Sequence, residues 1–202
     1  MKIKILTLLI LTPLFMFSQL RSGDVLIETN YGFVGGKGLW GTIAKEAGVP
    51  VSFFGPATLR LQYMSSDKLG VGVDINYSSR SLSGNTGTYI DENGFTQNFS
   101  YDLTQNVIRF MFRSSLEFVN NDKLQINWAN SVGYRASPWT FTVTDNSNAT
   151  EDDLSYDFGS WPLAFRTAIG LRYMLTDAIG INIEIIGLSG GSLMNGGVSI
   201  KL

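Results

Sequence analysis

The stretch Leu69–Arg80 reads LGVGVDINYSSR, and its residues alternate between two chemically different sets. The large apolar set is Val71, Val73, Ile75 and Tyr77, and the small or polar set is Gly72, Asp74, Asn76 and Ser78. Successive side chains of a β-strand point to opposite faces, so a period of two indicates a strand. The stretch therefore predicts a strand with one apolar face and one polar face.

The same alternation recurs in other segments along the chain. In the longest clean case, Trp161, Leu163 and Phe165 fall on one face, whereas Ala164 and Arg166 fall on the other. We therefore predict eight strands. They cover about residues 24–34, 54–64, 69–82, 99–119, 123–135, 160–175, 178–188 and 192–202.

The connections between these strands alternate in length. Three are tight and rich in residues that favour turns, at 65–68, 120–122 and 176–177. The others are the long loops Gly35–Phe53, Gly84–Asn98 and Ala136–Gly159 and the short connection Ser189–Gly191. All tight turns fall at the end of the strands that holds the N-terminus. This pattern predicts an all-β fold, an eight-stranded antiparallel up-and-down transmembrane β-barrel.

The first residues are typical of a signal peptide for export. Lys2 and Lys4 are followed by an apolar run from Ile5 to Phe17 and by the small residue Ser18. The run is shorter than the roughly 20 residues that a membrane-spanning helix needs. We expect a signal peptide over residues 1–18 and a barrel domain over residues 19–202.

The size of the residues on the polar face indicates which face lies inside the barrel. Many are small: Gly72, Ser78, Ala129, Ser131, Gly133, Ala164, Ala168 and Gly170. The interior of an eight-stranded barrel is just wide enough for side chains, so small residues interleaved with a few long ones suit it. The apolar face would then contact lipid. A soluble lipocalin-like carrier, with its apolar face inside, remains the alternative.

Aromatic residues on the apolar face gather near the strand ends. Those towards the long loops are Tyr31, Phe33, Tyr77, Tyr134 and Trp161, and those towards the turns are Tyr63, Phe118 and Tyr173. Two such girdles are typical of membrane barrels. Trp128 lies mid-strand and does not fit either girdle.

The polar face also carries charged residues, and arginine predominates among them. The predicted lumen residues are Glu28, Arg60, Asp74, Arg80, Arg109, Arg113, Glu117, Arg135, Arg166, Arg172 and Glu184, with Lys201 on the same face. Such a set fits a hydrogen-bonded network of arginine–carboxylate pairs that fills the lumen. A gated pore or a path for anions is the functional alternative.

Composition excludes several classes of function. The chain has no cysteine and no histidine, which removes thiolate metal sites, disulfides and mechanisms that use a histidine base. A net charge of −2 gives no indication of a nucleic-acid partner. We expect no enzyme activity, no catalytic residues, no cofactor and no metal site.

Together these features resemble the small eight-stranded outer-membrane barrels, similar to the transmembrane domains of the outer-membrane protein A and X families. The signal ending Phe17-Ser18-Gln19 resembles exported proteins of the Bacteroidetes. The resemblance implies a Gram-negative cell envelope, contact with outer-membrane lipid and lipopolysaccharide, insertion by the barrel-assembly machinery, and a monomer. The function we expect is a structural or surface-interaction role carried by the extracellular loops, towards a ligand that the sequence does not name. The alternatives are a narrow pore for small solutes and the soluble carrier.

Overall fold

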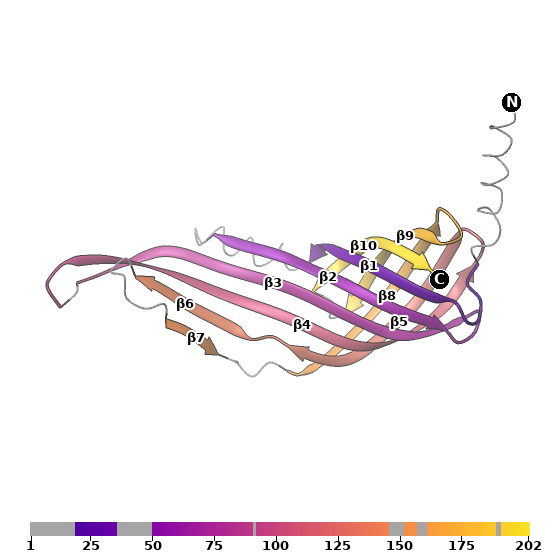
Figure 1. Cartoon of the computed structure of the whole chain (residues 1–202), viewed down its shortest axis with the longest axis horizontal. Coiled ribbons are helices and arrows are strands. Elements are labelled where there is room, and N and C mark those ends of the chain that lie inside the picture. Colours follow the sequence, from indigo (N-terminus) through magenta and orange to yellow (C-terminus); the bar gives the residue numbers. More distant parts are fainter. Residues whose placement is uncertain (1–18, 36–49, 91, 146–151, 157–160, 189–190) are drawn as a thin grey trace, which may run out of the picture.

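The computed structural model describes residues 19–35, 50–90, 92–145, 152–156, 161–188 and 191–202 (Figure 1). These residues form antiparallel strands. Their bounds are β1 (Val25–Gly35), β2 (Val51–Met64), β3 (Leu69–Ile90), β4 (Thr96–Asn120), β5 (Leu124–Ala136), β6 (Trp139–Asp145), β7 (Asp152–Tyr156), β8 (Leu163–Met174), β9 (Ile179–Leu188) and β10 (Ser192–Lys201).

Eight of these strands close into a barrel. Each pairs with both of its neighbours, in the order β1-β2-β3-β4-β5-β8-β9-β10, and β10 returns to β1. The closing pair places Glu28 opposite Ser199, while Glu28 also lies opposite Arg60 of β2. The predicted fold is confirmed, and each of the eight predicted segments overlaps one barrel strand.

Three tight turns join the barrel strands at one end, which also holds the C-terminus (Figure 1). Their side chains stabilise them: the hydroxyl of Ser66 accepts a hydrogen bond from the backbone N–H of Leu69 at 3.1 Å, and that of Thr176 accepts one from Ile179 at 3.0 Å. Hydroxyl residues favour turns because they bind nearby backbone groups in this way. We call this end of the barrel the turn end and the opposite end the rim.

Two of the predicted long loops are wrong, because most of their residues form strands. The segment Gly84–Asn98 continues β3 and β4 as one hairpin, with Tyr89 opposite Gln97. Its turn contains Asn93 and Gly94, and Gly94 has a φ of 81°, the conformation that glycine adopts readily. The predicted loop Ala136–Gly159 contains β6, which pairs with β4, and β7, which pairs with β6.

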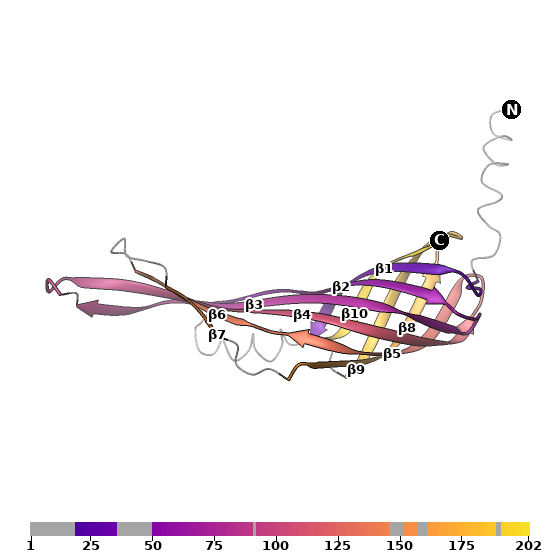
Figure 2. The same ribbon diagram turned by 60° about the horizontal axis from the view of Figure 1, so that its bottom comes forward.

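The first long loop is shorter than predicted, because β2 begins at Val51 and pairs there with Leu82 of β3. The rest of that loop, residues 36–49, and the predicted signal peptide, residues 1–18, lie outside the described residues. Beyond the rim, the β3–β4 hairpin projects as a long twisted ribbon with β6 beside it (Figure 2).

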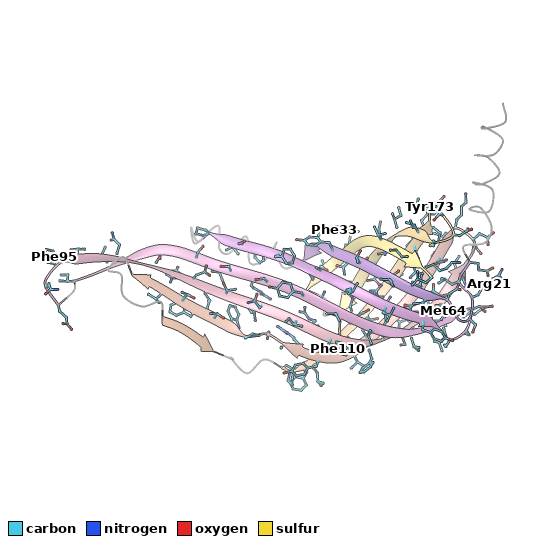
Figure 3. The ribbon with its side chains drawn as sticks, viewed as in Figure 1. Arg21, Phe33, Met64, Phe95, Phe110 and Tyr173 are labelled. Carbon is cyan, nitrogen blue, oxygen red and sulfur yellow. The ribbon has the colours of Figure 1, made fainter. Side chains whose placement is uncertain are left out.

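The apolar face of the barrel points outward. All eight barrel strands carry large, exposed apolar side chains: Tyr31, Phe33, Leu59, Leu61, Val71, Ile75, Phe110, Phe112, Trp128, Val132, Ile169, Leu171, Ile181, Ile183, Val198 and Ile200. Phe33, Phe110 and Tyr173 are seen on the outside of the wall in Figure 3. A carrier of the lipocalin type would have this face inside, so the structure contradicts that alternative.

The aromatic residues predicted as girdles are exposed on this outer surface. Near the rim, Phe54 contacts both Tyr31 and Tyr77, with ring centroids 6.1 and 5.9 Å apart. Trp128, which lies mid-wall, donates its indole N–H to the hydroxyl of Thr167 at 2.9 Å. This bond satisfies the polar atom of Trp128 without water.

No helix in the described part of the chain is long and apolar enough to span a membrane, a finding that does not bear on crossing by strands.

Candidate functional site

The predicted lumen residues point into the barrel from its strands. Nine of the eleven are buried: Glu28, Arg60, Asp74, Arg109, Arg113, Glu117, Arg166, Arg172 and Glu184. Arg80 and Arg135 are partly exposed. Because the barrel is closed, the inward-facing side chains of all its strands meet in one narrow space.

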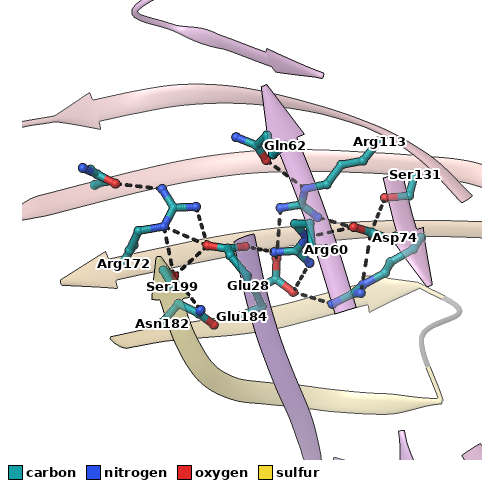
Figure 4. A network of polar contacts seen from close by, with 12 residues as sticks. Glu28, Arg60, Gln62, Asp74, Arg113, Ser131, Arg172, Asn182, Glu184 and Ser199 are labelled. Carbon is teal, nitrogen blue, oxygen red and sulfur yellow. Dashed lines mark hydrogen bonds and ion pairs between the residues drawn. The ribbon is translucent and has the colours of Figure 1, made fainter. Parts of the chain in front are cut away.

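Arg60 lies at the centre of this space and binds three carboxylates (Figure 4). Its Nε donates to Oδ1 of Asp74 at 2.8 Å, and its Nη2 donates to Oε2 of Glu184 at 3.1 Å. Its Nη1 also donates to Glu28. The planar guanidinium presents its five N–H groups in fixed directions, so one arginine can join carboxylates from β1, β3 and β9.

Glu184 binds two further arginines. Nη2 of Arg113 donates to its Oε1 at 3.0 Å, and Nη2 of Arg166 donates to its Oε2. Both arginines also lie near Asp74, with N–O distances of 3.7 and 3.9 Å. Among the described lumen carboxylates, Glu184 therefore accepts hydrogen bonds from the largest number of arginines.

Glu28 holds the fourth arginine, Arg172. Nε and Nη2 of Arg172 donate to Oε1 of Glu28 at 2.8 and 2.6 Å, and its Nη1 donates to Oε1 of Gln125 at 2.7 Å. Ser199 also donates to Oε1 of Glu28, and Asn182 donates to Ser199. Charge-assisted bonds of this kind are the stronger class of hydrogen bond.

The neutral members of the network lie on the predicted polar faces of their strands, but the sequence prediction did not name them as partners of the charged residues. They are Gln62, Gln125, Ser131, Asn182 and Ser199, and each has the parity of the charged residues on its strand. The alternation places them in the lumen, but which carboxylate or guanidinium each one reaches depends on the stagger between strands.

The network joins all eight strands of the barrel. Its side chains come from β1, β2, β3, β4, β5, β8, β9 and β10. Burial of ions carries a large desolvation cost, which strong mutual attraction and complete hydrogen bonding can offset. We infer that the network fixes the interior geometry and leaves little free space.

Small residues make room for these long side chains. A Cβ added to Gly170 would lie 2.7 Å from Oδ1 of Asn127, and one added to Gly70 would lie 2.4 Å from Nε2 of Gln62. The cavity beside Glu28 and Arg60 has a volume of about 10 Å³, room for about one water molecule. No group of three or more acidic side chains that could hold a metal ion occurs among the described residues.

The turn end of the lumen is closed by apolar side chains. Leu20, Leu26 and Met64 form a buried cluster there. Leu20 is held by Asn120, whose Oδ1 accepts its backbone N–H at 3.0 Å and whose Nδ2 donates to its carbonyl at 2.8 Å. This residue precedes the first strand and was not predicted to be part of the interior.

The remaining predicted charges lie outside the central network. Arg80, Arg109 and Arg135 lie towards the rim on β3, β4 and β5, and we call them the rim arginines. Glu117 is buried nearer the turn end, where neither of its carboxylate oxygens accepts a hydrogen bond from a described residue. Lys201 lies 3.9 Å from Asp24.

This arrangement of short turns, apolar exterior and polar lumen is typical of outer-membrane barrels. The chain matches no protein-family profile and no curated protein sequence. Several solved structures match the chain, among them the following three. Each alignment covers at least 90% of this chain and at least 99% of the other.

The first of these is the N-terminal β-barrel domain of OprF from Pseudomonas aeruginosa, with 12% identity and a TM-score of 0.38 over 91% of this chain. The second is the outer-membrane protein OprG from the same organism, with 12% identity and a TM-score of 0.42 over 92%. The third is Ail, the attachment invasion locus protein of Yersinia pestis, with 8% identity and a TM-score of 0.39 over 90%.

The two buried glutamates of the lumen give a direct test of the network. Glu184→Gln would place an amide against the guanidinium groups of Arg60, Arg113 and Arg166, so we expect it to lower the free energy of unfolding by about 3–5 kcal/mol. Glu117→Gln removes a buried charge without a hydrogen bond, and we expect a change of about 1 kcal/mol or less. Urea unfolding in detergent micelles measures both, and equal losses would contradict the network.

Proposed function

We propose that the protein is an integral barrel of the outer membrane, with a structural or surface-interaction role. The observation that carries this proposal is the outward apolar face on all eight strands, together with a charged interior. Ile169, Leu171 and Ile183 are 57%, 43% and 44% exposed, although each belongs to the regular part of a strand. In water such a surface would be a large aggregation liability, whereas hydrocarbon is its natural surrounding.

The closed sheet supports the same proposal. A strand in hydrocarbon cannot leave backbone N–H and C=O groups unpaired, and a closed barrel pairs them all between strands. The part of β3 from Leu69 to Arg80 exceeds the 9–11 residues that a tilted strand needs to cross a bilayer. The proposed partners are therefore outer-membrane lipid and lipopolysaccharide, with the barrel-assembly machinery needed for insertion of a monomer.

We assign the surface role to the sheet beyond the rim. The tip of the β3–β4 hairpin lies ten residues beyond Arg80, or roughly 33 Å at the rise of a strand. Ile90 and Phe95 at this tip are 72% and 66% exposed. The stacked rings of Tyr101 in β4 and Phe141 in β6, with centroids 6.5 Å apart, join these two strands beyond the rim. A projecting sheet with exposed apolar side chains is suited to contact with another surface.

A narrow pore is the weaker candidate. The ion pairs of Arg60, Arg113, Arg166 and Arg172 cross the lumen, and the cluster of Leu20, Leu26 and Met64 closes its turn end. We therefore expect the folded protein to give no steady conductance in a planar bilayer, and we propose a scaffold role without enzyme activity.

Charged substitutions in the wall test the membrane proposal. Ile169→Lys and Leu171→Lys place charges mid-wall, and each should cost about 2–4 kcal/mol if that position faces hydrocarbon. The matched variant Asn121→Lys adds the same charge at an exposed turn and should change little. The measurements are the free energy of unfolding in lipid vesicles and the amount recovered in the outer-membrane fraction. Full recovery of the wild-type protein as a soluble periplasmic product would contradict the proposal.

Epitope insertion tests the orientation. An epitope placed between Asn93 and Gly94, at the hairpin tip, should bind antibody on intact cells. The same epitope placed between Asp122 and Lys123, in a tight turn, should bind only after the cells are permeabilised, because short turns face the periplasm. The reverse accessibility would contradict the assigned surface role.

A further inference from the structure

The excess of positive charge in the barrel is confined to one place. In the central lumen, the arginines Arg60, Arg113, Arg166 and Arg172 form ion pairs with Glu28, Asp74 and Glu184. A fourth carboxylate, Glu117, is buried nearer the turn end. Lys201 has Asp24 beside it. The three rim arginines remain, and none of them forms an ion pair with a described carboxylate.

The rim arginines share one corner of the lumen. Arg109 and Arg135 are direct partners across the β4–β5 pair, and Arg80 lies opposite Gln105 of β4. The charge of Arg135 acts on both Arg80 and Arg109. Like charges that face each other across a sheet are destabilising. A site with three unmatched cations on adjacent strands therefore favours the binding of an anion.

The hydrogen-bonding groups of this corner are incompletely used. Arg109 donates to the amide oxygen of Asn76 at 2.8 Å, which satisfies one N–H and leaves the charge in place. Nε of Arg135 is buried and has no hydrogen-bond partner among the described residues. The same holds for Oγ of Ser137, on a residue that is 1% exposed, and for Oε1 of Gln105, on a residue that is 5% exposed. The N–H at Nε of Arg135 and the hydroxyl of Ser137 are thus the donors that this corner offers to a ligand.

The corner is reached from the rim. Arg80 and Arg135 are partly exposed, unlike the arginines of the central network. A Cβ added to Gly191, next to the start of β10, would lie 3.7 Å from Nη2 of Arg109. The guanidinium of Arg109 therefore extends across the lumen to the β9–β10 connection, at the rim and away from the apolar cluster of the turn end.

We infer that the rim arginines form a binding site for a phosphoryl group. Guanidinium groups match the oxygens of phosphate in paired hydrogen bonds, and a doubly charged oxyanion offsets more of the three positive charges than a carboxylate does. Inorganic phosphate, a soluble phosphate ester and the phosphorylated headgroup of lipid A all present this chemistry. The inference goes beyond the proposed surface role, because it depends only on the lumen and not on the projecting sheet.

Calorimetric titration of the folded full-length protein in a maltoside detergent tests this site, with inorganic phosphate as the probe at low ionic strength. The variant carries Arg80→Gln and Arg135→Gln. The matched control carries Lys68→Gln and Lys123→Gln, which remove the same charge from exposed positions at the turn end. Heat-dependent gel mobility shows that each protein is folded. If the double arginine variant does not fold, Arg80→Gln alone replaces it, since Arg80 is partly exposed and makes no ion pair with a described residue.

We expect saturable phosphate binding by the wild-type and control proteins. The dissociation constant of the arginine variant should be at least about tenfold larger. A second titration compares micelles that contain lipid A with micelles that contain dephosphorylated lipid A. Binding of lipid A alone, lost in the arginine variant, would assign the phosphoryl group to the lipid headgroup. If neither probe binds the wild-type protein more tightly than the arginine variant, the inference is wrong.

Discussion

The pairing of β1 with β10 is the contact on which the rest of the structure depends. It removes the two free edges of the sheet, so every strand of the wall has a partner on both sides. Closure also explains the alternation of residues. One face of each strand points into a narrow lumen, and the other face points outward. The apolar exterior and the charged interior both follow from this geometry and from the period of two.

The filled lumen is a consequence of closure around eight strands. Long polar side chains fit because small residues stand beside them, as Gly70 does beside Gln62 and Gly170 beside Asn127. In this enclosed space the partner of each charged side chain lies on another strand. Arg60 and Glu184 therefore connect parts of the chain that are 124 residues apart. At the rim, the rim arginines have no carboxylate partner among the described residues, so their positive charge is unmatched.

The sequence predicts the barrel strands and the direction of their faces because both depend on local periodicity. It also places Arg60, Asp74 and Glu184 in the lumen by parity alone. It does not predict which of them pair, because pairing depends on the stagger of strands around the whole barrel. The extension of β3 beyond the rim was missed for another reason: residues 83–88 read SGNTGT, so no apolar–polar alternation marks it. The turn residues Asn93 and Gly94 were the one local signal of the hairpin.

The central claim is that the outward face of the wall contacts hydrocarbon. The chain has no cysteine, so single cysteines can be introduced one at a time along Leu163–Met174 and labelled with an environment-sensitive fluorophore. In vesicles with brominated acyl chains, labels at Phe165, Ile169 and Leu171 should be quenched strongly, and labels at Ala164, Ala168 and Gly170 weakly. Equal quenching along the strand, or quenching confined to the second set, would contradict the assignment of inside and outside.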